Sequence, residues 1–343
     1  METRHQAILI GGLLGLSALI GAAGLSLSVA AQPDRIALKA KFQRPAEIPF
    51  PKDDPYSAAK AELGRMLFFD PVMSGAKTHA CATCHNPALS WGDGLPRAVG
   101  VKTLALRAPT LLNVAWTPKL GWDGHFRNLE TVAFGPLTTP ANMNITESQL
   151  IERLSAIPGY VDAFDEAFGE GDISKQKIEM ALATFERTII SGEAPFDRWL
   201  KGDENAIGAK AKHGFDLFVG KANCAACHSG WVFTDASFHD IGTAKGNDIG
   251  RGKLFPTSVE LRYAFKTPTL RDVARRSPYM HDGSVPTLQA VIDLYNKGGI
   301  ARPSRAKEIK PLDLSEDEKA DLIAFLEALT SAPSSVVMPT LPR

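Results

Sequence analysis

The chain has 343 residues, which is enough for two domains of ordinary size. A hydrophobic content of 44% with 22% charged residues is typical of a soluble globular protein. Lysine and arginine together (38) equal aspartate and glutamate (38), so the chain lacks the basic excess that phosphate binding requires. We therefore exclude nucleic acid as a partner.

Residues 1–31 predict a secretory signal peptide. Residues 7–31 carry no charge, are rich in Leu, Ile, Ala and Gly, and end in the small residues Ala30 and Ala31. We expect export to the periplasm and cleavage after Ala31. The apolar run is longer than that of most signal peptides, so an uncleaved N-terminal anchor is the alternative and the only membrane contact that we expect. Residues 32–55 are rich in proline, which predicts an extended arm.

All four cysteines belong to two short motifs of the pattern Cys-x-x-Cys-His. This pattern attaches haem c, because two thiols add across the two haem vinyl groups and the histidine becomes the proximal iron ligand. The residues are Cys81, Cys84 and His85, followed by Cys224, Cys227 and His228. Disulfides, redox dithiols or a zinc site would not explain a histidine directly after both pairs. We therefore predict two covalently bound haem c groups, with His85 and His228 as proximal ligands.

The sequence around the two motifs repeats. Residues 63–68 and 213–218 predict a helix before each motif, residues 108–111 match 267–270, and Asp-Gly pairs follow at 123 and 282. We predict a mostly α fold with long loops, in which two cytochrome c-like haem domains related by an internal repeat span 56–200 and 201–330. The first includes a connecting helix over 178–200. Residues 331–343 predict a loose tail.

The last helix of the chain has a recognisable start. Ser315 and Glu318 form the pattern of a capping box, in which each side chain binds the backbone N–H group of the other residue. Apolar residues then recur at three and four positions from Leu322 onward. We predict an amphipathic helix that closes the second domain.

The register of the repeat predicts that the two haem sites differ. Tyr295 lies 13 residues after Asp282, and the same offset from Asp123 leads to Pro136. Tyrosine can bind iron as a phenolate, whereas proline offers no donor atom. We expect a closed second haem ligated by Tyr295 and an open first haem faced by Pro136, where a small oxidant binds. Met280 is the alternative ligand of the second iron, since it lies 52 residues after His228.

These residues resemble the bacterial di-haem cytochrome c peroxidase and MauG family over residues 50–330. The segments that carry the resemblance are 81–88, 107–113, 121–124, 135–136, 266–273 and 277–284. The resemblance implies an oxidoreductase that binds hydrogen peroxide at the first haem and transfers electrons through the second. It also implies that Trp122 lies between the haems as a relay. The peroxidases usually have methionine at the position of Tyr295, whereas MauG has tyrosine, which stabilises ferric iron and lowers its potential.

Several positions depart from the peroxidase pattern. The resemblance places a blocking histidine near Val101, where this chain has none, so we expect the first haem to stay open. It places a distal carboxylate at Asn142, which can hydrogen-bond peroxide but cannot relay a proton. Arg107 and Arg276 stand at positions that bind calcium in the family, and we expect calcium to be absent or displaced by these cations. Arg251 is predicted to contact a haem propionate or to form a loop salt bridge.

Three functions are compatible with these residues. The first is reduction of hydrogen peroxide with electrons from a small donor protein, either a cytochrome c or a cupredoxin. The second is MauG-like oxidation of tyrosine or tryptophan side chains in a partner protein. The third is a non-enzymatic electron carrier or ligand sensor. Tyr295 and the missing histidine favour the second function over the first, whereas Asn142 favours the third.

Overall fold

The computed structural model describes residues 31–333 and 336–343. The predicted signal peptide therefore lies outside the described residues except for Ala31. The chain divides into two compact units, Met1–Lys39 and Ala40–Arg343, which we treat separately. Across the part of the chain that the structure describes, no helix is both long and apolar enough to cross a membrane.

The prediction of an extended arm over 32–55 is wrong at its start, because helix α1 spans Ala31–Ala40. Its C-terminal half, Ile36-Ala-Leu-Lys-Ala40, consists of good helix formers, and a proline in the first turn of a helix does not break it. The high proline content of residues 32–55 as a whole conceals this local preference for helix. Residues 41–57 contain no helix or strand.

The regular structure of the second unit is mostly helical, as the sequence predicted. The α-helices are α2 Ala58–Phe69, α3 Cys81–Cys84, α4 Phe134–Thr138, α5 Glu147–Ser155, α6 Pro158–Phe168, α7 Lys175–Arg187, α8 Pro195–Leu200, α9 Ala209–Val219, α10 Leu288–Lys297 and α11 Glu316–Ala328. Short 3₁₀ turns span Pro71–Met73, Pro87–Leu89, Val114–Trp116, Leu129–Thr131, Cys224–Ala226, Arg251–Lys253 and Val273–Arg275. Strands β1 (Phe238–His239) and β2 (Phe265–Lys266) form one antiparallel pair, with Phe238 opposite Lys266.

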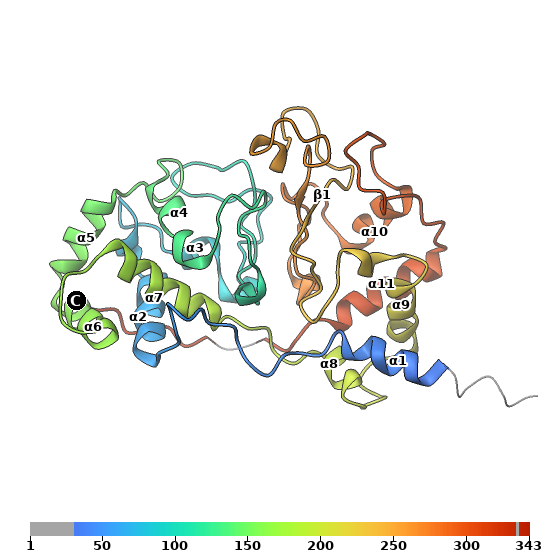
Figure 1. The fold of residues 1–343 in the computed structure, drawn as a ribbon, viewed down its shortest axis with the longest axis horizontal. Coiled ribbons are helices and arrows are strands. Elements are labelled where there is room, and N and C mark those ends of the chain that lie inside the picture. The colour runs from blue at the N-terminus through green and yellow to red at the C-terminus, as the bar shows by residue number, and fades with distance from the viewer. Residues whose placement is uncertain (1–30, 334–335) are drawn as a thin grey trace, which may run out of the picture. The chain divides into compact units, whose positions relative to one another are not determined.

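Two pairs of helices provide the framework, and each pair packs at a glycine. Helix α2 lies against α7, and α9 lies against α11 (Figure 1). A Cβ atom on Gly64 of α2 would lie 1.9 Å from the Ala181 carbonyl oxygen of α7. A Cβ atom on Gly214 of α9 would lie at the same distance from the Asp321 carbonyl oxygen of α11. Only glycine allows the two backbones of each pair to approach this closely.

We call the predicted domains 56–200 and 201–330 the first and the second half. The helix predicted to connect them is interrupted. A continuous helix over 178–200 was predicted, but α7 ends at Arg187 and α8 begins only at Pro195. Proline suits the first turn of a helix but cannot continue one, so Pro195 marks a new start. The preceding segment is held in place from the first half, because Asn113 Oδ1 accepts a hydrogen bond from the Ser191 N–H group at 3.0 Å.

Helix α8 packs against the second half. The Phe196 ring lies 5.4 Å from Phe215 of α9 and 5.3 Å from Phe325 of α11, measured between ring centroids. Asp197 forms an ion pair with Arg271 at 2.8 Å, and the Arg271 side chain is fully buried. Breaking a buried pair of this kind leaves an uncompensated charge and is strongly destabilising.

Both ends of the unit lie against the half that is distant in sequence. Near the N-terminal end, Phe42 is buried and stacks on Phe233, with 5.1 Å between the ring centroids. Near the C-terminal end, Val336 packs on the core of the first half. Arg65 of α2 donates a hydrogen bond to the Val337 carbonyl at 2.6 Å. The predicted loose tail is thus irregular in structure, but it is attached to the first half.

The predicted start of the last helix is confirmed. Ser315 caps α11, its hydroxyl accepts from the Glu318 N–H group, and the Glu318 carboxylate accepts from the Ser315 N–H group. The helices predicted before each motif are also present, as α2 and α9. These elements were predictable because local residues alone determine them.

We expect Gly214→Ala to lower the free energy of unfolding by about 1–3 kcal/mol, because the added methyl group must push α9 away from α11. Gly208→Ala is the matched control. Gly208 caps the same helix, and its added Cβ atom meets no other atom within 4 Å. Denaturant unfolding of both haem-loaded variants measures the difference. Equal stability of the two variants would contradict the close packing.

Candidate functional site

A cavity that extends from the second half to residues of the first half, such as Leu89 and Pro109, brings together the residues predicted to hold the second haem. It is lined by Cys224, Cys227 and His228 of the motif and by both candidate axial ligands, Met280 and Tyr295. Residues of α9, α10 and α11 complete its walls, including Phe218, Ile292, Leu322 and Leu326. An apolar pocket with a small set of convergent polar groups is the usual form of a cofactor site.

The two motif histidines have the same hydrogen-bonding pattern. His228 Nδ1 lies 3.0 Å from the Phe233 carbonyl oxygen, and His85 Nδ1 lies 3.3 Å from the Trp91 carbonyl oxygen. A carbonyl only accepts, so Nδ1 carries the hydrogen in each ring and Nε2 keeps a free lone pair. Burial is the main cause that lowers the pKa of both histidines. Both are therefore neutral imidazoles with Nε2 available to a metal.

The cysteine thiols fit covalent haem attachment better than a metal cluster. All four are free, and burial raises the pKa of Cys81 and of Cys224 to about 12. Zinc or an iron–sulfur cluster binds several thiolates together. Within the described residues, the metal-binding group that the geometry identifies contains a single cysteine, Cys227.

Tyr295 and Met280 approach the second cavity from different elements. Tyr295 lies on α10, which begins where the Thr287 hydroxyl accepts a hydrogen bond from the Ala290 N–H group. Burial is the main cause that raises the pKa of Tyr295, and the neighbouring Cys224 adds to it. The phenol is therefore neutral until a cation such as iron stabilises its phenolate. Met280 lies in a tight turn with a φ angle of +72° and lines the same cavity.

Trp122 links residues of both halves beside this cavity. Its indole Nε1 donates to the Arg107 carbonyl at 2.9 Å, and its own carbonyl accepts from the Lys266 N–H group at 2.8 Å. Its ring lies 6.4 Å from the His281 ring, which in turn stacks on Phe265 at 3.6 Å. Aromatic groups are therefore continuous from the first half into the wall of the second cavity.

Arg107 and Arg276 line the same cavity, and each is a partly or fully buried cation. Burial lowers the pKa of Arg276 to about 10, the charge of Asp272 opposes this shift, and the charge of Arg107 adds to it. One guanidinium nitrogen of Arg276 donates to the Thr269 carbonyl, whereas its buried Nε has no partner. Two neighbouring cations with an unsatisfied N–H group call for an anion. The carboxylates of a bound haem would supply that anion.

The first site is assembled by a loop at 99–102. The Cys84 thiol approaches the Val99 carbonyl, with 3.8 Å between sulfur and oxygen. The Asn142 carbonyl accepts a hydrogen bond from the Val101 N–H group at 2.8 Å. A Cβ atom on Gly100 would lie 2.6 Å from the Asn142 Cα atom, so the contact is tight. Pro136 belongs to α4, and its carbonyl accepts from the Met143 N–H group at 3.2 Å.

Among the residues that the structure describes, Arg251 has no carboxylate partner, so the alternative of a loop salt bridge is wrong. Its guanidinium donates to the Asp123 carbonyl at 2.6 Å and to the Gly124 carbonyl at 3.3 Å. It also lies over the Phe238 ring at 4.0 Å from the centroid. Backbone carbonyls of a tight Asp-Gly turn point outward and can satisfy a cation without a carboxylate. The predicted contact between Arg251 and a haem propionate stays a prediction.

Two further side chains lie at the second site, and one of them, Lys266, was not predicted as a site residue. Lys266 lines the cavity, donates to the Lys119 carbonyl at 3.1 Å, and has a pKa lowered to about 8 by burial. His281 is buried and pairs with Asp248 at 2.7 Å. The repeat contained a signal for Lys266, because Lys266 precedes Pro268 by the same two residues as Arg107 precedes Pro109. The fold then explains why both cations reach one cavity.

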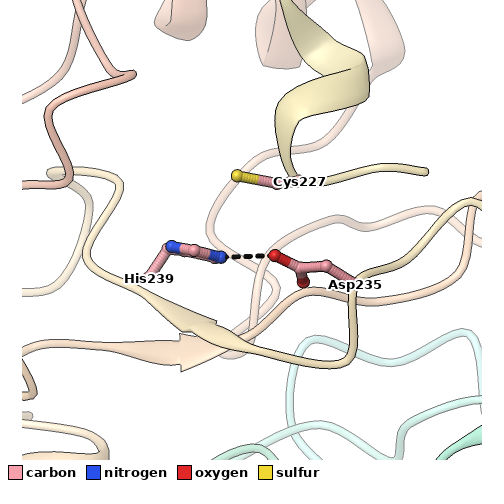
Figure 2. A group of neighbouring side chains, drawn as sticks. All are labelled: Cys227, Asp235 and His239. Carbon is pink, nitrogen blue, oxygen red and sulfur yellow. Dashed lines mark hydrogen bonds and ion pairs between the residues drawn. The ribbon is translucent and has the colours of Figure 1, made fainter.

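His239 and Asp235 form an ion pair beside Cys227. Figure 2 shows the His239 ring pointing at the Asp235 carboxylate, with Nε2 of His239 2.7 Å from Asp235 Oδ2 and the Cys227 sulfur near both. The three ligand atoms are close enough to hold a metal ion. Attachment of haem would convert the Cys227 thiol into a thioether and remove its thiolate. We therefore assign the pair a structural role next to the haem edge.

Comparisons with known proteins agree with this geometry. A family model described as di-haem cytochrome c peroxidase matches residues 58–205. The methylamine utilization protein MauG of Methylorubrum extorquens is 52% identical over 98% of this chain and 96% of its own length. The protein of the same name from Methylophilus methylotrophus is 47% identical over 88% and 92%. A crystal structure of a MauG-like protein associated with microbial copper homeostasis superposes with a TM-score of 0.78 at 30% identity, covering 84% of this chain and 94% of that one.

We expect Asp235→Asn to reduce the dependence of stability on pH. The Asp235 carboxylate is the largest cause that raises the pKa of His239 to about 10, and it remains when haem attachment removes the smaller contribution of the Cys227 thiol. A raised pKa contributes stability that is complete below the unfolded value of about 6.5 and is lost as pH rises toward 10. Denaturant unfolding at several pH values should show this fall in the wild type and a flatter profile in the variant. Asp123→Asn is the control, since its partner His125 is more exposed. An unchanged profile in Asp235→Asn would contradict the assignment.

Proposed function

Since the chain belongs to the di-haem cytochrome c peroxidase and MauG family and is a peroxidase-type oxidoreductase with two haems, we propose that it is a MauG-type enzyme. In this proposal it binds hydrogen peroxide at the haem held by His85. It then oxidises tyrosine or tryptophan side chains of a partner protein through the haem held by His228. The observation that carries the proposal is Tyr295, which lines one cavity with Cys224, Cys227 and His228.

When bound covalently to the two cysteine pairs, the haems would supply an iron position for peroxide and one-electron redox chemistry. The polypeptide orients both groups. Phe233 and Trp91 fix the imidazole tautomers of the two motif histidines, and Arg107 and Arg276 offer counter-charges to the haem carboxylates at the second site. We propose that these guanidinium groups also occupy the position of the calcium found in the family.

Tyr295 distinguishes the proposed activity from that of an ordinary peroxidase. A phenolate ligand favours ferric iron and lowers the reduction potential, which makes the second site a poor acceptor of electrons from a small donor protein. It makes the same site suited to removing electrons from a substrate docked outside it. The side chain sits on α10, in the wall of the cavity, and no second donor on that helix competes with it among the residues that line the cavity.

At the first site, the side chains near the proposed peroxide position are proline and asparagine. Pro136 has no donor atom for iron, so a haem bound at this site would keep a position open to peroxide. Asn142 can donate a hydrogen bond to bound peroxide, but it cannot deliver a proton. We propose that Asn142 orients peroxide and that the proton for O–O cleavage comes from water. No histidine stands at Val101 to block the site.

Trp122 supports electron transfer between the two sites. Its indole is hydrogen-bonded to the Arg107 carbonyl in the first half and is in edge contact with His281 at the second cavity. We propose that Trp122 would relay electrons between the two haems when both are bound. Trp122 is fixed in this position by two hydrogen bonds, one from its indole to the Arg107 carbonyl and one from the Lys266 N–H group to its own carbonyl.

The second candidate is reduction of hydrogen peroxide with electrons from a cytochrome c or a cupredoxin. The name of the matching family model supports it, since that family is described as cytochrome c peroxidase. Membership in a family of peroxidases disfavours the hypothesis of a non-enzymatic carrier or sensor. For either activity we propose export to the periplasm, which rests on the charge-free residues 7–31.

We expect the fully ferric protein to react with one equivalent of hydrogen peroxide within seconds, because the first site needs no reduction to open. Loss of the Soret absorbance in a stopped-flow experiment measures the rate. Asn142→Ala should slow the reaction, and Asn142→Glu should accelerate it by up to ~10²–10⁴-fold through added proton transfer. The proposal is wrong if neither the ferric nor the half-reduced wild-type protein reacts with hydrogen peroxide. Rapid turnover with a reduced small cytochrome would favour the second candidate.

We expect Tyr295→Phe to raise the reduction potential of the second haem, because the variant cannot stabilise ferric iron with a phenolate. A tenfold change in the reduction equilibrium corresponds to about 59 mV, and the shift should be at least that large. Met280→Leu is the matched control and should leave the potential nearly unchanged. Spectroelectrochemical titration measures both variants. A shift in Met280→Leu with none in Tyr295→Phe would identify Met280 as the ligand instead.

A further inference from the structure

Glu186 is a buried carboxyl group beside the first Cys-x-x-Cys-His motif that the proposed mechanism does not use. It lies on α7, and its side chain is 9% exposed. It is close enough to Cys81 that its negative charge contributes to raising the pKa of that thiol. A carboxyl group in such a place is uncommon, because glutamate is rarely buried without a partner.

The packing of the two helix pairs shows which way Glu186 faces. A Cβ atom on Gly64 would lie 2.8 Å from Cβ of Phe185, and one on Gly214 would lie 2.8 Å from Cβ of Phe325. Phe185 and Phe325 are therefore at matching positions of α7 and α11. The next residues, Glu186 and Leu326, also match.

Leu326 lines the cavity that contains Cys224, His228 and Tyr295. Glu186 is the counterpart of Leu326 on α7. By this match, Glu186 faces the first haem at the position where Leu326 faces the second. The proximity of Glu186 to Cys81 supports this placement independently of the match. At this position the first site thus has a titratable carboxyl group where the second has a leucine.

The charges around Glu186 do not neutralise it. Arg187, its neighbour on α7, forms an ion pair with Glu130 of the 3₁₀ turn Leu129–Thr131 at 2.5 Å. On α2, Lys60 is paired with Asp54, and Arg65 is paired with Glu62. The 3₁₀ turn Val114–Trp116 has no titratable side chain, and α3 contributes Cys81 and Cys84.

The balance of these causes keeps Glu186 protonated near neutral pH. Burial is the largest cause that raises the pKa of Glu186 to about 8, and the charge of Glu130 raises it further, while Arg187 lowers it. The carboxyl group is therefore poised to gain or lose a proton when a nearby charge changes.

We propose that Glu186 is the proton acceptor coupled to reduction of the first haem. Glu186 takes up one proton from water when the iron held by His85 takes up one electron from a one-electron donor, and it releases that proton on reoxidation. No bond to iron forms or breaks in this step. The proposal rests on the proposed function only in placing a haem at Cys81, Cys84 and His85.

The physical cause is the charge on the iron. Ferric iron carries one more positive charge than ferrous iron and so stabilises the Glu186 carboxylate. The pKa of Glu186 is therefore lower in the ferric than in the ferrous state. Between these two values, the potential of the first haem falls as pH rises. The limiting slope is about 59 mV per tenfold change in proton concentration, for one proton and one electron.

The test is a redox titration of the haem-loaded protein at several pH values, in which absorbance and EPR follow the two haems separately. We expect the potential of the first haem to fall with rising pH in the wild type. In Glu186→Gln it should be independent of pH and should stay at the value that the wild type reaches in acid, because glutamine mimics the protonated carboxyl. Redox-difference infrared spectra should show a carboxyl C=O band in the wild type that is absent from this variant.

Two further variants serve as controls. Glu179→Gln removes another buried carboxyl of α7, whose pKa is also raised by burial, and it should keep the slope of the wild type. Glu186→Asp keeps a titratable group and should retain a pH dependence if the haem is attached. A wild type with no slope, or a slope that persists in Glu186→Gln, would overturn the proposal. A normal slope in a protein that does not react with peroxide would overturn the proposed function alone.

Discussion

The hydrogen bond between each motif histidine and a backbone carbonyl is the interaction on which both candidate haem sites depend. In a buried imidazole, this bond decides which nitrogen holds the hydrogen and which is free for a metal. The carbonyls come from Trp91 and Phe233, which follow their histidines by six and five residues. Each motif is thus oriented by its own loop, within a few residues of the cysteines.

Around this shared arrangement the two sites differ in the polar groups that surround them. The second has a neutral phenol, two buried guanidinium groups and a lysine of lowered pKa, so its surroundings are positively charged. The first has a buried carboxyl, an asparagine and a proline. The first site is therefore uncharged near neutral pH, and this difference in charge is a direct means of giving two chemically identical cofactors different potentials.

The sequence alone predicted much of the local structure and of the primary site. The cysteines and histidines are contiguous in the chain, and the capping box of α11 depends on four adjacent residues. Cys224, His228 and Tyr295 were expected at one site from the repeat, and the structure gathers them around one cavity. The choice between Tyr295 and Met280 stayed open, because both line that cavity.

Other features depend on contacts that no local pattern encodes. Arg251 turned out to bind the carbonyls of residues 123 and 124, which are 128 and 127 positions away. Glu186 sits in a helix whose apolar spacing looks ordinary, and only the packing against α2 shows that it is buried. The break before Pro195 was hidden by the apolar spacing on both sides of it. Long-range burial of polar groups is the part of this structure that the sequence pattern could not reveal.

The crossing of the two chain ends has a consequence for how the protein folds. Phe42 emerges early in synthesis, but its aromatic neighbours Phe196, Phe215 and Phe233 lie 154 or more residues further along the chain. The tail at Val336 and Val337 must in turn reach back to the first half. Such pairings between distant parts of a chain form late, because the loop entropy is lost before the contacts compensate for it. The arm can therefore dock only when the second half is available, and neither half is complete until the whole chain has been made.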